Sequence, residues 1–123
     1  MRSFLLTSLA FLLVALAGCA GSQPAGPTLD ARVLGEWESN GGTRYTFTDA
    51  GDTYGLSVID NDGEVFEVVS VTWADGVLGW SYDVPSTGYT VRESVVDVSE
   101  SRIEVEWENQ TGASGTDTLT RTE

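Results

Sequence analysis

The sequence predicts an all-β fold: an antiparallel up-and-down meander of about eight strands that closes into a small barrel. Beyond residue 30 the chain consists of short runs rich in β-branched and aromatic residues, and no run has a helical periodicity. Turns of two to seven residues join these runs and leave no room for crossover helices. An open meander would expose two strand edges, and closure into a barrel removes both.

The first four predicted strands are Val33–Glu38, Thr43–Thr48, Thr53–Ile59 and Glu64–Trp73. Asn40-Gly41-Gly42 and Asp60-Asn61-Asp62-Gly63 are typical of hairpin turns between them. In the fourth strand the apolar positions change from even to odd numbers near Val68. This change of phase indicates a bulge, or a strand buried on both faces.

The last four predicted strands are Val77–Val84, Tyr89–Val98, Arg102–Glu108 and about Thr116–Arg121. The first of these has apolar side chains at every second position, whereas Tyr89–Val98 changes phase in the same way as the fourth strand. Arg102–Glu108 alternates apolar residues with glutamates, which is typical of a strand with one solvated face.

An export signal precedes this domain: Arg2, an apolar run, and then Leu16-Ala17-Gly18-Cys19. The last four residues resemble the lipobox of bacterial lipoproteins, which implies that Cys19 is diacylglycerylated and becomes the first residue after cleavage. An ordinary signal peptide with a chance cysteine is the alternative. The chain has no second cysteine for a disulfide, and an unpaired exported thiol would be a liability.

The predicted organisation is therefore a signal peptide at 1–18, a lipidated flexible tether at 19–29 and a barrel domain at 30–123. Two or three acyl chains give stable membrane attachment where one does not. Cys19 is followed by Ala20 and not by an aspartate. By resemblance to sorted lipoproteins, this implies the outer membrane. We expect a cell-envelope location, at the periplasmic face of the outer membrane or the cell surface rather than at the inner membrane.

The composition excludes several functions. Removal of residues 1–18 takes away Arg2 and no acid, so the formal charge changes from −13 to −14, which argues against nucleic acid as a partner. The chain has no histidine and no lysine, so it lacks the commonest general base, the commonest transition-metal ligand and a Schiff-base nucleophile. We expect a protein that is not an enzyme and has no cofactor and no metal.

Leu34-Gly35-Glu36-Trp37, together with Leu119-Thr120-Arg121, resembles the framework of lipocalin-like (calycin) domains. In that family a Gly-x-Trp in the first strand packs under an arginine of the last strand and seals one end of the barrel. The resemblance implies that Gly35, Trp37 and Arg121 close the barrel through a cation–π contact. The chain departs from true lipocalins in being much shorter and in lacking their disulfide.

Five aromatic residues fall on inward-facing positions of the later strands and are candidates to line a site for a small hydrophobic ligand. They are Trp73, Trp80, Tyr82, Tyr89 and Trp107. The alternative is that they only fill the core, since an eight-stranded barrel is just wide enough for its own side chains or for one small ligand.

Acidic residues offer weaker candidates. Glu67 and Glu93 interrupt apolar strands, and we expect both to face solvent; an inward one would need a partner such as Arg44 or Arg92. Asp60-Asn61-Asp62-Gly63-Glu64 invites a calcium interpretation, but Val58 stands at the loop's first ligand position and no closing glutamate follows, so a hairpin turn fits better.

Two functions from different classes remain. The first is a lipid-anchored binding module for a small hydrophobic ligand. The alternative is an acidic interaction or inhibitor module that docks a cationic protein of the envelope.

Overall fold

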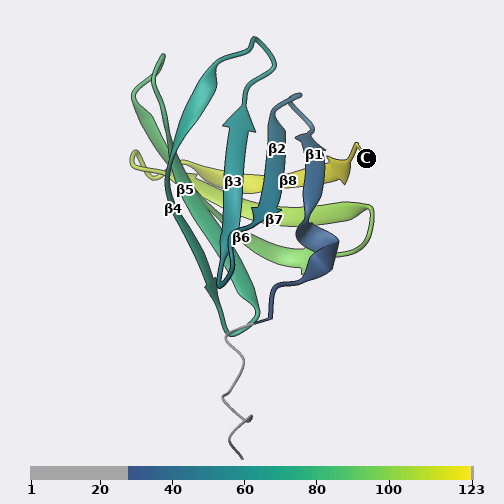
Figure 1. Cartoon of the computed structure of the whole chain (residues 1–123). Coiled ribbons are helices and arrows are strands. Elements are labelled where there is room, and N and C mark those ends of the chain that lie inside the picture. The colour runs from purple at the N-terminus through teal and green to yellow at the C-terminus, as the bar shows by residue number, and fades with distance from the viewer. Residues whose placement is uncertain (1–27, 123) are drawn as a thin grey trace, which may run out of the picture.

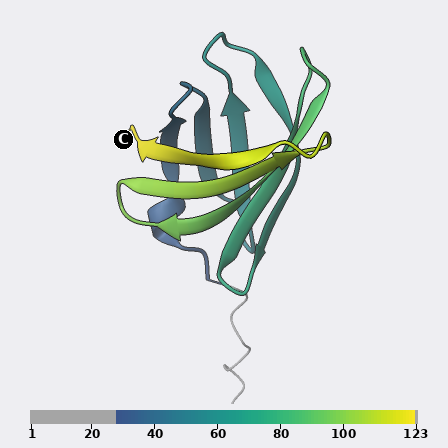
Figure 2. The same cartoon turned by 180° about the vertical axis from the view of Figure 1, so that it is seen from behind.

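Eight antiparallel strands in sequence order close into one barrel in the computed structural model, which describes residues 28–122 (Figure 1). This confirms the predicted fold class, and β5 and β6 have the predicted bounds. β1 pairs with β8 as well as with β2, so the sheet has no free first or last strand (Figure 2). The strands are β1 (Gly35–Ser39), β2 (Arg44–Asp49), β3 (Tyr54–Ile59), β4 (Val65–Ala74), β5 (Val77–Val84), β6 (Tyr89–Val98), β7 (Arg102–Asn109) and β8 (Ser114–Arg121).

A single 3₁₀ turn, η1 (Ala31–Val33), precedes β1, so Val33 lies in this turn and not in the predicted first strand. The Asp30 side chain caps the turn by accepting a hydrogen bond from the Arg32 backbone N–H at 3.0 Å. The Asp30 backbone N–H donates to the Tyr54 hydroxyl at 2.6 Å, and this hydroxyl donates to the Asp30 carbonyl at 3.0 Å. These contacts attach the segment before β1 to β3.

Trp37 and Arg121 join the first strand to the last at the end of the barrel that η1 covers, which we call the closed end. The Arg121 guanidinium lies 4.2 Å from the centroid of the Trp37 ring, and Trp37 is fully buried. Arg121 also donates to the carbonyls of Leu34 at 2.8 Å and Glu100 at 2.6 Å, and to that of Arg32. The Trp37 indole N–H donates to the Val33 carbonyl at 2.8 Å. One guanidinium thus connects η1, β1, β8 and the β6–β7 turn.

Gly35 begins β1 with a φ of 119°. This backbone conformation is strained for a residue with a Cβ. Glycine at this position therefore lets the chain turn from η1 into β1 and place Trp37 in the barrel.

The core consists of the inward-facing side chains of all eight strands and Val33. The rings of Phe47 and Trp80 are 5.3 Å apart, those of Tyr45 and Trp80 5.9 Å, and those of Phe66 and Tyr82 5.0 Å. The buried apolar residues are Val33, Trp37, Tyr45, Phe47, Tyr54, Val58, Phe66, Leu78, Trp80, Tyr82, Ile103, Val105 and Leu119.

The two predicted changes of phase are β-bulges. The register of β4 against β5 shifts between Val68 and Ser70, and that of β6 against β7 shifts between Val95 and Asp97. The extra residues, Val69 and Val96, are 62% and 54% exposed. Each bulge lets its strand keep apolar side chains inside on both sides of the shift.

The end opposite η1 is formed by four hairpin turns, and we call it the open end. The turns join β1 to β2, β3 to β4, β5 to β6, and β7 to β8. Their residues are 40–43, 60–64, 85–88 and 110–113.

The closed end yields a first prediction. Arg121→Ala removes the cation–π contact and the donors to three carbonyls, so we expect it to lower the free energy of unfolding by about 3 kcal/mol. Arg102→Ala is the matched control, because it makes the same change in charge but breaks only an exposed ion pair with Glu104, which contributes at most about 1 kcal/mol. Urea unfolding followed by tryptophan fluorescence measures both. Equal losses in the two variants would contradict the role assigned to Arg121.

Candidate functional site

A buried acid lies inside the barrel, in the half toward the open end. Glu93 on β6 is only 2% exposed, and the hydroxyl of Tyr45 on β2 donates to its Oε1 at 2.7 Å. The expectation that Glu67 and Glu93 both face solvent is wrong for Glu93, whereas Glu67 is exposed. The reason is the position of the bulge: β6 changes phase at Val96, after Glu93, so Glu93 shares the inner face with Val91 and Val95.

The partner of Glu93 is a phenol and not an arginine, so the partners expected from the sequence are also wrong. Arg92 points to the outer face, where it pairs with Glu108 at 3.2 Å, and Arg44 is exposed. Within residues 28–122, no arginine lies within ion-pair distance of Glu93. The barrel therefore holds a carboxyl group without a compensating cation.

Burial determines the ionisation of this group. Loss of solvation raises the pKa of Glu93, and the hydrogen bond from Tyr45 opposes the shift without cancelling it. Asp117 on β8 adds repulsion that also raises this pKa. Burial, with the Glu93 charge as the second cause, raises the pKa of both Tyr45 and Tyr82, so both phenols stay protonated donors.

Trp80 places a buried polar atom without a hydrogen-bond partner beside Glu93; the Trp73 indole N–H and the Thr53 hydroxyl are two others in the described residues. Trp80 is opposite Glu93 in the β5–β6 ladder and is only 2% exposed. Its indole N–H is buried and, within the described chain, forms no hydrogen bond of normal geometry. The same N–H is near enough to Glu93 to lower the pKa of its carboxyl group, as the smallest of the effects on that pKa. Buried donors are rarely left unpaired in folded proteins, so this one requires an explanation.

The five predicted lining residues do not form one surface. Trp80 and Tyr82 are buried in the core, and Trp107 is half-buried with its indole against Gly115. Trp73 packs edge-on against Tyr54 toward the closed end, at 5.4 Å between ring centroids. Tyr89 is 43% exposed at the start of β6. The structure thus brings Trp80, Tyr82 and Trp107 near Glu93 and leaves Trp73 and Tyr89 away from it.

Trp107 is the half-exposed neighbour of Glu93. It is opposite Glu93 in the β6–β7 ladder and opposite Gly115 in the β7–β8 ladder. A Cβ on Gly115 would lie 3.0 Å from the indole, so the absence of a side chain there gives the ring its place. Replacement of Gly115 would displace the indole.

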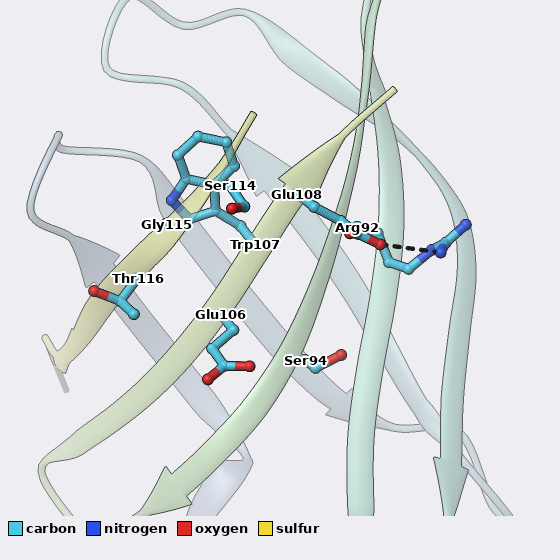
Figure 3. Close-up of a pocket in the computed structure, with 8 residues that line it drawn as sticks. All are labelled: Arg92, Ser94, Glu106, Trp107, Glu108, Ser114, Gly115 and Thr116. Atoms are coloured by element: carbon cyan, nitrogen blue, oxygen red, sulfur yellow. Dashed lines mark hydrogen bonds and ion pairs between the residues drawn. The ribbon is translucent and has the colours of Figure 1, made fainter. Parts of the chain in front are cut away.

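Four hollows lie on the described residues, and of the aromatic residues near Glu93 only Trp107 borders one of them. One of about 470 Å³ lies over the outer face of β6, β7 and β8 (Figure 3). Glu106 borders it without an ion pair in the described chain, and the Arg92–Glu108 pair forms its other side. Neither this hollow nor the other three is lined by Trp80 or Tyr82, which pack in the core.

The acidic turn between β3 and β4 gathers Asp60, Asp62 and Glu64, with carboxylate oxygens within 4.8 Å of one another. Each already accepts hydrogen bonds: Asp60 from Thr43 and Asn61, Asp62 from the Glu64 backbone, and Glu64 from Ser86. These contacts are those of an Asx-rich hairpin turn.

The predicted lipidation site, Cys19, and the signal peptide lie outside the described residues, while Leu29 from the predicted tether packs against the core. In the part of the chain that the structure describes, no helix is long and apolar enough to cross a membrane.

Comparisons with protein-family models, curated proteins and solved structures found no match.

The buried acid yields a second prediction. The pKa of Glu93 is raised in the folded state, so protonation of this carboxyl group favours folding. This contribution to the free energy of unfolding is present at low pH and is lost as the pH rises through the raised pKa. Glu93→Gln cannot ionise, so we expect it to gain stability relative to the wild type as pH rises, by about 1.4 kcal/mol for each unit of elevation. Urea unfolding between about pH 4 and about pH 8 measures the difference.

Glu67→Gln is the control for this measurement, because Glu67 lies exposed on the outer face. We expect its stability to follow that of the wild type over the whole pH range. If the stability of Glu93→Gln also follows that of the wild type over this range, burial does not raise the pKa of Glu93.

Proposed function

We propose that this protein is a lipid-anchored binding protein of the cell envelope that holds a small, largely apolar ligand at the open end of a lipocalin-like barrel and catalyses no reaction. The sequence Leu16–Cys19 supports the anchor. The closed barrel, with Arg121 on Trp37, supports the likeness to lipocalin-like domains.

The buried Glu93–Tyr45 pair carries the proposal for ligand binding. A core that served only stability would be better filled by apolar side chains, because burial of a carboxyl group without a compensating cation is costly. Glu93 instead lies among aromatic rings in the half of the barrel toward the open end, beside an unpaired indole N–H. A few polar groups within an apolar lining are the usual composition of a small-molecule site.

The outer face of β6–β8 favours a second candidate, the docking of a cationic protein. The hollow there is open to solvent, and the exposed Glu106 borders it in a strongly acidic chain. Two of the three outward glutamates of β7 are already paired, Glu104 with Arg102 and Glu108 with Arg92. This internal pairing lowers the charge available to a partner, so we place ligand binding first.

Native mass spectrometry tests the first candidate. The chain from Ala20 onward contains the whole closed barrel and is purified without a tag, then measured before and after extraction with organic solvent. We expect an added mass of a few hundred daltons that extraction removes. If the mass is unchanged and a basic protein co-purifies until salt is raised, the second candidate replaces the first.

A separate experiment tests the anchor. Cys19→Ser in the complete chain removes the acyl acceptor, so we expect the protein to move from the membrane fraction to the soluble fraction and to lose incorporation of labelled fatty acid. Ser22→Ala, three residues further on in the predicted tether, is the control and should stay with the membrane. Membrane association of both variants would contradict lipidation at Cys19.

A further inference from the structure

The charges within the barrel have one sign. In the described residues, Glu93 and the half-buried Asp117 face the interior near the open end. The arginines lie at the closed end or on the outer face; they are Arg32, Arg44, Arg92, Arg102 and Arg121. The chain has no lysine and no histidine. No side chain of residues 28–122 therefore supplies a cation to this part of the interior.

Aromatic rings surround the same place. Tyr45, Trp80 and Tyr82 pack around Glu93 in the core, and Trp107 lies opposite it in the ladder. The faces of aromatic rings carry negative electrostatic potential and attract cations, most strongly when the cation is desolvated. A carboxyl group among such rings is chemically complementary to an organic ammonium ion, which provides N–H donors for the acid and positive charge for the rings.

The open end has the same sign of charge. Its turns contain three acidic residues, Asp60, Asp62 and Glu64, all in the β3–β4 turn, while one basic residue, Arg44 at the start of β2, borders the same hollow as Asp60. An acidic rim raises the local concentration of cations and repels anions such as fatty acids. The rim and the interior thus favour the same class of ligand, although they lie on different strands and turns.

We propose that the open end of the barrel binds an apolar molecule carrying a protonated amine, whose ammonium group reaches the carboxylate of Glu93. This inference rests on the proposed function and names its ligand class. Trp107, the half-exposed residue opposite Glu93 in the β6–β7 ladder, is the neighbour of Glu93 whose displacement would admit the ligand. Gly115, on which its indole rests, presents no side chain to hinder that movement.

Three probes of equal chain length separate the chemistry of the head group from simple apolar binding: octylammonium, 1-octanol and octanoate. Titration of the chain from Ala20 onward is followed by isothermal calorimetry near pH 7. We expect octylammonium to bind at least about tenfold more tightly than either other probe, because only a cation gains the Coulomb attraction of a poorly solvated carboxylate.

Two matched variants locate the site. Glu93→Gln keeps the shape of the side chain and removes its charge, so octylammonium should lose about tenfold in affinity while 1-octanol is unchanged. Glu67→Gln removes an exposed acid and should bind all three probes as the wild type does. Affinity of the wild type for octylammonium should also rise with pH as Glu93 ionises, and that of Glu93→Gln should not.

The groups that face Glu93 from the other strands are Tyr45, Tyr82 and Asp117. Both phenols remain protonated over this pH range because their pKa values are raised. Asp117→Asn removes the other interior acid and keeps an oxygen that can accept from the Asn40 backbone N–H; because Glu93 remains, the affinity for octylammonium should still rise with pH.

The outcomes separate the inference from the proposed function. If 1-octanol or octanoate binds as tightly as octylammonium, or if Glu93→Gln binds octylammonium unchanged, the ammonium inference is overturned while ligand binding stands. If no probe binds, both fail. Should Glu93→Gln unfold, Tyr45→Phe replaces it: loss of the phenol donor that favours the charged carboxylate raises the pKa of Glu93 further, so the increase of octylammonium affinity with pH should move to higher pH, and an unchanged pH dependence would overturn the inference.

Discussion

The contact of Arg121 with Trp37 is the interaction on which the closed barrel depends. β1 and β8 pair through only three residue pairs, Trp37 with Arg121, Glu38 with Thr120, and Ser39 with Leu119. So short a ladder provides few backbone hydrogen bonds, and the guanidinium adds contacts to the indole face and to three carbonyl groups. The Thr122 backbone N–H also donates to the Glu36 carbonyl at 3.0 Å, so backbone pairing and the Arg121 contacts together join the first strand to the last.

This arrangement divides the barrel into two physically different halves. At the closed end, hydrogen bonds join η1 and Asp30 to Trp37 and Tyr54, although the Trp73 indole N–H there is buried without a partner in the described chain. Toward the open end, Glu93 has no cation within ion-pair distance, and the Trp80 indole N–H forms no hydrogen bond of normal geometry within the described residues. Local departures from the rules of burial concentrate at functional positions.

The strands were predictable because a half-buried strand requires alternating apolar and polar side chains, and this alternation is visible within a few consecutive residues. Alternation in Val77–Val84 gives the strand and its inner face directly, and the turns with glycine and acidic residues give the ends. The bulges were visible as changes of phase in β4 and β6. Arg121 lies over eighty residues from Gly35 and Trp37 in the sequence, and only resemblance to a known framework predicted that they meet.

The Glu93–Tyr45 pair was not predictable, for a specific physical reason. An acid on the inner face of a strand gives the same local pattern as a change of phase, so the sequence of β6 cannot locate its bulge on one side of Glu93 or the other. Its partner Tyr45 is 48 residues away and belongs to β2, across the barrel. Such a contact depends on the closed geometry as a whole, and no spacing along the chain indicates it.

A comparison of alternative residues at position 93 shows why the pair points to function. Glutamine would accept the same hydrogen bond from Tyr45 without a charge, and leucine would fill the space without a polar atom; both avoid the loss of solvation that raises the pKa of Glu93. Stability alone therefore does not explain a carboxyl group here. A cationic ligand would explain it, because its charge compensates the buried carboxylate, and this attraction contributes affinity and selectivity for cations. The open end, where the acidic rim lies, is the side from which such a partner would approach.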